Sequence, residues 1–243
     1  MLSPFLNNLI KFSLLLAIGL ALPLPVIADL SVPSTLISLD SEQGEKMLLD
    51  SNYKSSYWQL SRYFISEENI AFCSVASMVM VLNALNIERP LSPDLYPYSL
   101  FTQSNVFNNP TVVKMFQPRA VASKGLSLQQ LANFTSALGV KNQIYFAAND
   151  TGLSEFRKTA KNVLSNQNSY LIINFNRQAL GEVGQGHFSP IAAYDPGSDS
   201  FLLMDVARYK YPPTWIKADT LWKAMEDNDG TSKKPRGYLV LTN

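Results

Sequence analysis

The longest apolar run beyond the first 28 residues extends from residue 69 to residue 86 and contains few polar side chains. From Val75 onward its apolar content is too continuous for a half-exposed strand. The run is also too long for most strands and far too short to span a bilayer, which predicts a buried helix. Pro90 follows and cannot continue a helix. Cys73, the only cysteine of the chain, therefore stands in the first turn of the predicted helix.

This placement has a chemical consequence for Cys73. The unpaired N–H groups and the positive end of the macrodipole at a helix start favour a thiolate over a thiol. The position suits a nucleophilic cysteine. The alternative is structural, a small buried residue that packs at a helix start.

The remaining apolar patterns predict short elements along the rest of the chain. Extended or alternating runs predict strands, and amphipathic runs predict helices, one of them opened by a capping box at Ser127 and Gln130. The predicted strands are residues 36–39, 141–147, 170–175, 188–194, 201–206 and 237–242, and the further helices are residues 42–49, 111–116, 127–138, 154–164 and 220–226. Residues 88–110 hold four prolines and are predicted to be irregular. Helices gather early and strands late, which indicates an α+β fold.

Residues 1–28 resemble a secretory signal peptide. Lys11 precedes an apolar run that is about half the length of a spanning helix, and small or modest side chains precede a cut after Ala28. The interpretation predicts an exported chain, periplasmic or extracellular, with a single catalytic domain over residues 29–243. An uncleaved tether is the alternative.

Charge argues against a nucleic-acid partner. The chain has 20 basic and 19 acidic side chains, and removal of residues 1–28 takes away Lys11 alone, which leaves a formal net charge of 0. A nucleic-acid or anionic-membrane partner normally leaves a basic excess or stripe. Neither is visible, and the cluster at residues 233–236 is interpreted as a solvated loop. No membrane contact is expected once the signal peptide is removed.

A single cysteine in an exported chain limits the chemistry. It cannot form a disulfide within its own chain, so its retention indicates use, a disulfide between two copies, or deep burial. A homodimer is therefore left open. With one cysteine and one histidine in total, no Cys/His metal cluster is expected.

The sole histidine, His187, follows a glycine-rich turn at the start of a predicted strand, and the next strand begins after a strong turn signal at residues 195–199. A hairpin centred near Gly197 places Asp205 opposite Ser189, on the face that carries His187. The diagonal distance between β-carbons would be roughly 5–8 Å, within reach of a carboxylate to an imidazole. Taken alone, each residue has a structural alternative: a satisfied histidine at a strand start and an aspartate in a strand-end turn.

Cys73, His187 and Asp205 together fit nucleophilic thiol catalysis. A thiolate attacks, an imidazolium stabilises it and later protonates the leaving amine, and a carboxylate orients the ring. The order Cys, His, Asp and the wide spacing resemble papain-like enzymes, in which the cysteine opens a buried helix facing the sheet that carries the histidine. The residues thus favour a cysteine-dependent acyl-transfer enzyme.

Three segments also resemble the catalytic region of phytochelatin synthases: residues 71–85 around Cys73, residues 186–190 around His187, and residues 204–215 around Asp205. They occur in the right order across nearly all of the chain after residue 28, as in short, exported, catalytic-domain-only members. The resemblance implies a papain-like fold with an N-terminal helical half, the nucleophile helix packed on a C-terminal antiparallel β-sheet.

The resemblance implies an activity as well. Glycine would be cleaved from glutathione through a γ-glutamylcysteinyl thioester on Cys73, with His187 as acid and base and Asp205 as its orienter. Water would then release γ-glutamylcysteine, or a second glutathione would take the acyl group and yield phytochelatin. Because the cysteine-rich C-terminal region of plant members is absent, hydrolysis is expected over metal-activated polymer synthesis. Glutathione and related γ-glutamyl peptides are the expected partners, no cofactor is expected to be tightly bound, and a heavy-metal ion would enter as a thiolate complex of the substrate.

The resemblance also assigns residues around the triad. Arg208 and Lys210 are expected near the charged groups of the substrate, since a guanidinium matches a carboxylate by a two-pronged contact. A surface ion pair is the alternative for Arg208.

One position departs from the family pattern. Six residues before the cysteine, the family has a glutamine that donates to the oxyanion, and this chain has Glu67. An ionised glutamate has no proton to donate and would repel a developing oxyanion. Gln59, eight residues further upstream, is an unsuitable substitute without a rearranged loop. Three outcomes follow: a slow enzyme, an enzyme that uses a protonated Glu67, or an inactive protein that binds glutathione or thiol peptides.

Overall fold

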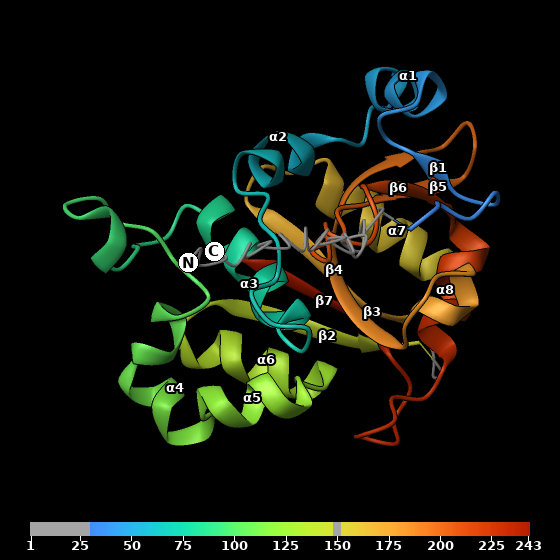
Figure 1. Ribbon diagram of the computed structural model, residues 1–243. Coiled ribbons are helices and arrows are strands. Elements are labelled where there is room, and N and C mark those ends of the chain that lie inside the picture. The colour runs from blue at the N-terminus through green and yellow to red at the C-terminus, as the bar shows by residue number, and fades with distance from the viewer. Residues whose placement is uncertain (1–29, 148–151) are drawn as a thin grey trace, which may run out of the picture.

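An antiparallel seven-stranded sheet forms the centre of the described residues, 30–147 and 152–243, of the computed structural model (Figure 1). Residues 1–28, the predicted signal peptide, lie outside the described residues. The strand order is β1-β6-β5-β4-β3-β7-β2. The strands are β1 (Ile37–Ser38), β2 (Lys141–Phe146), β3 (Ser169–Asn176), β4 (Gly186–Asp195), β5 (Ser200–Leu203), β6 (Thr214–Lys217) and β7 (Gly237–Thr242).

Helices cover both faces of this sheet (Figure 1). They are α1 (Glu42–Asp50), α2 (Ser55–Arg62), α3 (Cys73–Ala84), α4 (Pro110–Met115), α5 (Pro118–Lys124), α6 (Leu128–Ala137), α7 (Leu153–Leu164) and α8 (Ala218–Glu226), with short 3₁₀ turns η1 (Pro93–Leu95), η2 (Asn105–Asn108) and η3 (Arg177–Leu180). Most helices precede most strands, which confirms the predicted α+β class, and the arrangement is consistent with a papain-like fold.

The alternation of side chains along β3 explains why the sheet is covered twice. Tyr170 and Ile172 pack into one core with α3 and α6, whereas Leu171, Ile173 and Phe175 pack into a second core with α7 and α8. Successive side chains of a strand point to opposite faces. A strand covered on both faces therefore has the continuous apolar sequence seen here, rather than an alternating one.

Helix α3 is the predicted buried helix. Every residue from Cys73 to Asn83 is buried, and Leu85 ends the helix in extended conformation. The helix packs on one face of the sheet against β4 and β3, so Cys73 is brought to the C-terminal half of the chain (Figure 1).

Several predicted boundaries were wrong or incomplete. The strand expected at residues 201–206 ends at Leu203, because residues 205–207 turn and Asp205 accepts a hydrogen bond from the N–H of Ala207. Helices α2 and α5 and strand β6 were not predicted. For α5, Pro118 at its first position and Gly125 just beyond its end were the available signals.

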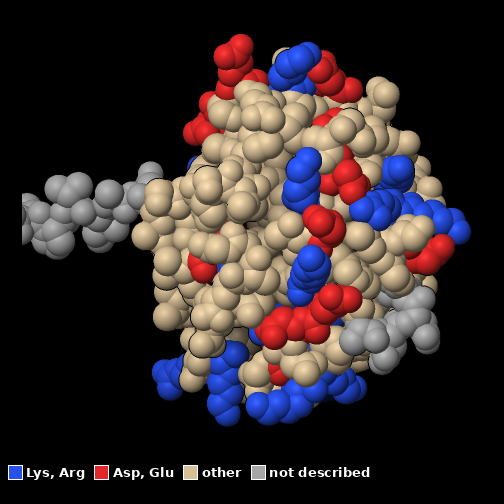
Figure 2. Space-filling view, turned by 90° about the vertical axis from the view of Figure 1, so that its right-hand side faces the viewer, with Lys and Arg blue, Asp and Glu red and all other residues tan. Residues whose placement is uncertain are grey.

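Charges on the surface are mixed. On the face drawn in Figure 2, groups of both signs alternate across the middle, Lys and Arg gather along the lower edge, and broad areas carry neither. Within residues 30–147 and 152–243, no helix combines the length and the apolar character needed to cross a membrane.

Candidate active site

Cys73 is the first residue of α3, and the helix start is uncapped. The preceding residue, Phe72, makes no side-chain capping bond. Ala76 is the first residue whose N–H reaches back to a carbonyl, that of Phe72. Within the described residues, the N–H groups of Cys73, Ser74 and Val75 have no recorded acceptor. The positive end of the helix thus lies beside the thiol, which favours negative charge there.

His187 and Asp205 form the contact expected from the hairpin. Nε2 of His187 lies 2.9 Å from Oδ1 of Asp205, and both side chains are buried. Strands β4 and β5 pair with a register shift between Ile191 and Ala193, beyond which the N–H of Met204 bonds to the carbonyl of Pro190. This continuation puts Asp205 alongside Ser189, the predicted neighbour.

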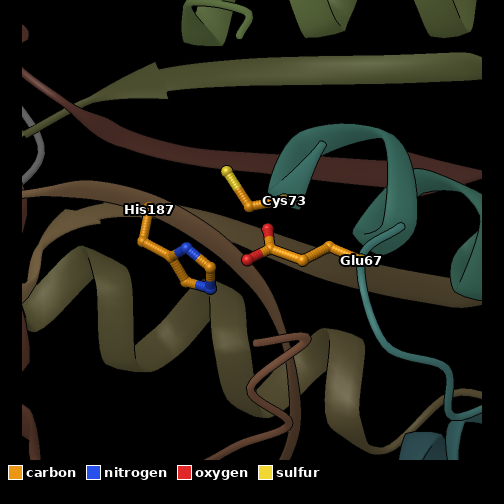
Figure 3. Close-up of side chains that lie close together, drawn as sticks. All are labelled: Glu67, Cys73 and His187. Atoms are coloured by element: carbon orange, nitrogen blue, oxygen red, sulfur yellow. The ribbon is translucent and has the colours of Figure 1, made fainter. Parts of the chain in front are cut away.

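The Nδ1 side of the imidazole faces Cys73 and Glu67 (Figure 3). One donor atom each from Glu67, Cys73 and His187 lie within 4.8 Å of one another. Because Nε2 is held by Asp205, the other ring nitrogen is left for the thiol. The structure therefore brings the three predicted catalytic side chains together from α3, β4 and the segment after β5.

Glu67 is buried beside the thiol and the imidazole, with 7% of its surface exposed (Figure 3). Its Oε1 accepts a hydrogen bond of 2.6 Å from the hydroxyl of Tyr209, and its backbone N–H donates to the carbonyl of Val206. Its Oε2 is buried without a hydrogen-bond partner among the described residues. The oxyanion position predicted from the sequence is thus occupied by a carboxylate that points at the reacting groups.

A buried guanidinium stands behind Asp205, and sequence reasoning missed it. Nη2 of Arg177 donates to Oδ1 of Asp205 at 2.8 Å and lies 2.7 Å from Oδ2, while Nη1 pairs with Glu182. Arg177, Glu182 and Asp205 are all buried. The available signal was an arginine that directly follows a largely apolar strand and shortly precedes the glycine-rich turn.

These contacts determine the charges of His187 and Asp205. Burial alone would lower the pKa of His187, but the charges of Asp205 and Cys73, with the hydrogen bond to Asp205, raise it to about 9. Burial alone would raise the pKa of Asp205, but His187, Arg177 and the N–H of Ala207 lower it to about 2. At neutral pH the pair is an imidazolium held by a carboxylate.

The thiol opens into a cavity of about 340 Å³. Its lining is mostly small or polar and includes three charged residues: Ile70, Ala71, Cys73, Ala122, Ser123, Lys124, Gly125, Leu126, Gln185, Gly186, Phe188, Asp229, Gly230, Thr231 and Arg236. Nη1 of Arg236 donates hydrogen bonds to Oδ1 of Asn174 at 2.9 Å and to Oδ2 of Asp229 at 3.1 Å. Lys124 is exposed and has no recorded partner among the described residues. The cavity can hold a small, charged peptide next to the nucleophile.

The profile of the phytochelatin synthase family matches residues 27–238. The chain belongs to this family. Among the similar proteins is glutathione gamma-glutamylcysteinyltransferase 1 of Lotus japonicus, which is 32% identical over 85% of this chain and 40% of its own length. Number 2 of Arabidopsis thaliana is 31% identical over 88% of this chain and 46% of its own length. The protein of that name from Schizosaccharomyces pombe is 26% identical over 86% and 50%. The chain thus spans half or less of these relatives.

Within this phytochelatin synthase fold, Arg208 and Lys210 lie away from the cavity that Cys73 lines. The guanidinium of Arg208 stacks 4.5 Å from the ring of Phe64 and donates to its carbonyl at 3.4 Å. Nζ of Lys210 lies 5.9 Å from the ring of Tyr209. Their expected contact with the substrate stays a prediction, and Lys124 is the lysine that the structure places at the cavity instead.

Proposed function

We propose that this chain is a thiol acyltransferase that cleaves glycine from glutathione through an acyl-enzyme on Cys73. The observation that carries the proposal is the arrangement at the start of α3: a buried thiol, an imidazole whose Nε2 is fixed 2.9 Å from Asp205, and a free Nδ1 side facing the thiol. Membership of the phytochelatin synthase family and relatives named for γ-glutamylcysteinyl transfer support the choice of glutathione.

The first half-reaction follows from the charges. The thiolate of Cys73 attacks the carbonyl carbon of the peptide bond between cysteine and glycine in glutathione. As the intermediate collapses, His187 gives its proton to the leaving nitrogen, the C–N bond breaks, and glycine leaves with a neutral amine. A γ-glutamylcysteinyl thioester remains on the sulfur. Asp205 and Arg177 keep the ring oriented throughout.

The second half-reaction uses His187 as a base. The neutral imidazole takes a proton from water, which attacks the thioester and releases γ-glutamylcysteine. The amine of a second glutathione attacking in place of water would yield phytochelatin. The size of the cavity, about 340 Å³, allows one small peptide beside Cys73, and we favour hydrolysis as the main route.

The oxyanion of the tetrahedral intermediate would be stabilised by the helix start. The N–H groups of Cys73 and Ser74 have no recorded acceptor within the described residues and are available as donors. An ionised Glu67 would repel the oxyanion, whereas a Glu67 protonated at Oε2 would donate a further hydrogen bond to it. The slow enzyme and the enzyme with a protonated Glu67 are therefore distinguished by Glu67→Gln. The similar proteins are named as transferases and give no support to the inactive alternative.

Substrate charge would be recognised by charged residues of the cavity lining. We assign Lys124 to a carboxylate of glutathione, because it lines the cavity, is exposed, and has no ion-pair partner among the described residues. Asp229 and Arg236 also line the cavity and already pair with each other at 3.1 Å. Export to the periplasm or the cell exterior completes the proposal. Its support is the apolar pattern of residues 1–28, and detection of a mature chain that begins at Asp29 tests it.

Incubation with glutathione tests the activity directly. Wild type is expected to release glycine and to show a γ-glutamylcysteinyl adduct in its intact mass, whereas Cys73→Ser is expected to do neither. Cys73→Ser differs from wild type by one atom of the side chain and serves as the matched control. If wild type binds glutathione yet gives neither glycine nor adduct, the proposed activity is wrong.

A further inference from the structure

The group that departs from the family pattern also completes a set of metal ligands. Glu67, Cys73 and His187 supply a carboxylate oxygen, a sulfur and an imidazole nitrogen, and these atoms lie within 4.8 Å of one another. Their side chains lie next to one another at the start of α3 (Figure 3). Oxygen, sulfur and nitrogen donors of this kind are the usual ligands of Zn²⁺ and of the thiophilic cations that resemble it.

We propose that Glu67, Cys73 and His187 bind one thiophilic divalent cation, such as Zn²⁺ or Cd²⁺, and that this cation blocks attack by Cys73. The site does not depend on turnover of glutathione. With the sulfur coordinated, its lone pair is no longer available to a carbonyl carbon.

Geometry allows a tetrahedral site with small adjustments. Zinc bonds of about 2.0–2.3 Å place neighbouring ligand atoms roughly 3.5 Å apart. Closing from 4.8 Å or less requires only side-chain rotation, and Glu67 has three rotatable bonds. Of the three ligands, Cys73 also lines the cavity of about 340 Å³, from which water or a thiol of the substrate would supply a fourth ligand.

The unpartnered oxygen of Glu67 points independently to a ligand. Glu67 is only 7% exposed, and its Oε2 is buried with no hydrogen-bond partner among the described residues. A buried carboxylate oxygen without a partner is costly, and a cation removes that cost. The thiolate and the carboxylate together carry the two negative charges that a dication neutralises.

The other two proposed ligands, His187 and Glu67, are each fixed by a hydrogen bond to a second residue. Nε2 of His187 lies 2.9 Å from Asp205, which leaves Nδ1 for the metal, and the hydroxyl of Tyr209 holds Oε1 of Glu67 at 2.6 Å. Metal-binding histidines and carboxylates are usually fixed by such partners, whose loss costs 10–100-fold in affinity. The supporting contacts of a metal site are thus in place.

Competition between the full chain and a chromophoric chelator measures Zn²⁺ binding without glutathione. Wild type is expected to bind one ion, Glu67→Gln at least tenfold more weakly, and Tyr209→Phe about tenfold more weakly. Glu68→Gln is the matched control, because Glu68 is the adjacent, exposed carboxylate, and its affinity is expected to equal that of wild type. Absence of binding by wild type, or equal affinity in Glu67→Gln and wild type, overturns the proposal.

A second measurement locates the ion without relying on the fold of a variant. One equivalent of Zn²⁺ is expected to slow alkylation of Cys73 by iodoacetamide at least tenfold in wild type, and a stronger chelator is expected to restore the rate. Cys73 is the only cysteine, so the label reports this site alone. Binding of one ion with no change in the alkylation rate would place the metal elsewhere and overturn the proposal. Because glutathione is absent from both measurements, neither failure bears on its cleavage.

Discussion

The guanidinium of Arg177 lies 2.7 Å from Oδ2 of Asp205, and both groups are buried. Arg177 also pairs with Glu182, so one cation joins two buried carboxylates. Asp205 in turn holds His187 at 2.9 Å. The orientation of the imidazole therefore depends on a charge that lies outside the triad itself. In the proposed mechanism Arg177 is a positioning residue, since it contacts Asp205 and would act on His187 only through that carboxylate.

Arg177→Met is expected to destabilise the fold by about 3–5 kcal/mol, because it leaves two buried carboxylates without their cation. Arg157→Met is the matched control: Arg157 pairs with Asp199 in a partly exposed position, and its loss is expected to cost about 1 kcal/mol or less. Urea unfolding of both variants measures the difference. Adding Glu182→Gln to Arg177→Met is expected to recover part of the loss, and equal costs for Arg177→Met and Arg157→Met would show that the buried network contributes little.

The free energy of unfolding is expected to decrease as the pH rises, because of His187. Its pKa is raised from 6.5 to about 9 in the folded chain, so its contribution is fully present below pH 6.5 and is lost as the pH rises through 9. The contribution amounts to at most about 3 kcal/mol. Urea unfolding of wild type and His187→Gln at pH 6 and pH 9.5 tests this. The difference between the two proteins is expected to shrink with pH, and a constant difference would contradict the raised pKa.

Asp205 acts in the opposite direction at acid pH. Its pKa is lowered from 3.8 to about 2, so its contribution is present above pH 3.8 and is lost as the pH falls through 2. Asp205→Asn is therefore expected to remove part of the acid-induced loss of stability. Unfolding followed between pH 5 and pH 2 measures it, and parallel curves for the variant and wild type would rule out the lowered pKa.

Glu67→Gln is expected to raise the turnover of glutathione. The amide restores a donor at the oxyanion, and such a donor is worth about 10²–10³ in rate in other enzymes. The assay contains a chelator, so that loss of a bound cation does not contribute to the increase. Glu68→Gln is expected to leave turnover unchanged. An unchanged or lower rate in Glu67→Gln would show that the carboxylate is adapted to its task, by donating from a protonated form.

Lys124→Ala is expected to raise KM for glutathione about fivefold with little change in kcat, since a partly solvated ion pair is worth about 1 kcal/mol. Lys114→Ala, an exposed lysine on α4, is the matched control and should have no effect. Steady-state kinetics of the two variants separate binding from chemistry. If Arg208→Ala raises KM and Lys124→Ala does not, the substrate lies where the sequence resemblance had suggested.

The sequence sufficed to predict the contact between His187 and Asp205 because its geometry is local. A strong turn at residues 195–199 joins two adjacent strands, so register alone brings His187 and Asp205 together. The position of Cys73 followed from the length and continuity of one apolar run. Arg177 and Tyr209 could not be predicted in the same way. Their contacts with Glu182, Asp205 and Glu67 depend on how the segments beyond the strands fold back onto the sheet. The hydrophobic periodicity of the sequence contains no information about this folding.

The most direct test of the account is the rate of Cys73 alkylation by iodoacetamide as a function of pH, measured with a chelator present. The lone cysteine makes the label unambiguous. If His187 holds a thiolate as an ion pair, wild type is expected to react rapidly already at pH 6, with little change up to about pH 9, the pKa of His187. His187→Gln is expected to react at least tenfold more slowly at pH 6. Labelling of wild type that rises only near pH 8.5, as for a free thiol, or equal rates in His187→Gln, would contradict a catalytic Cys73–His187 pair.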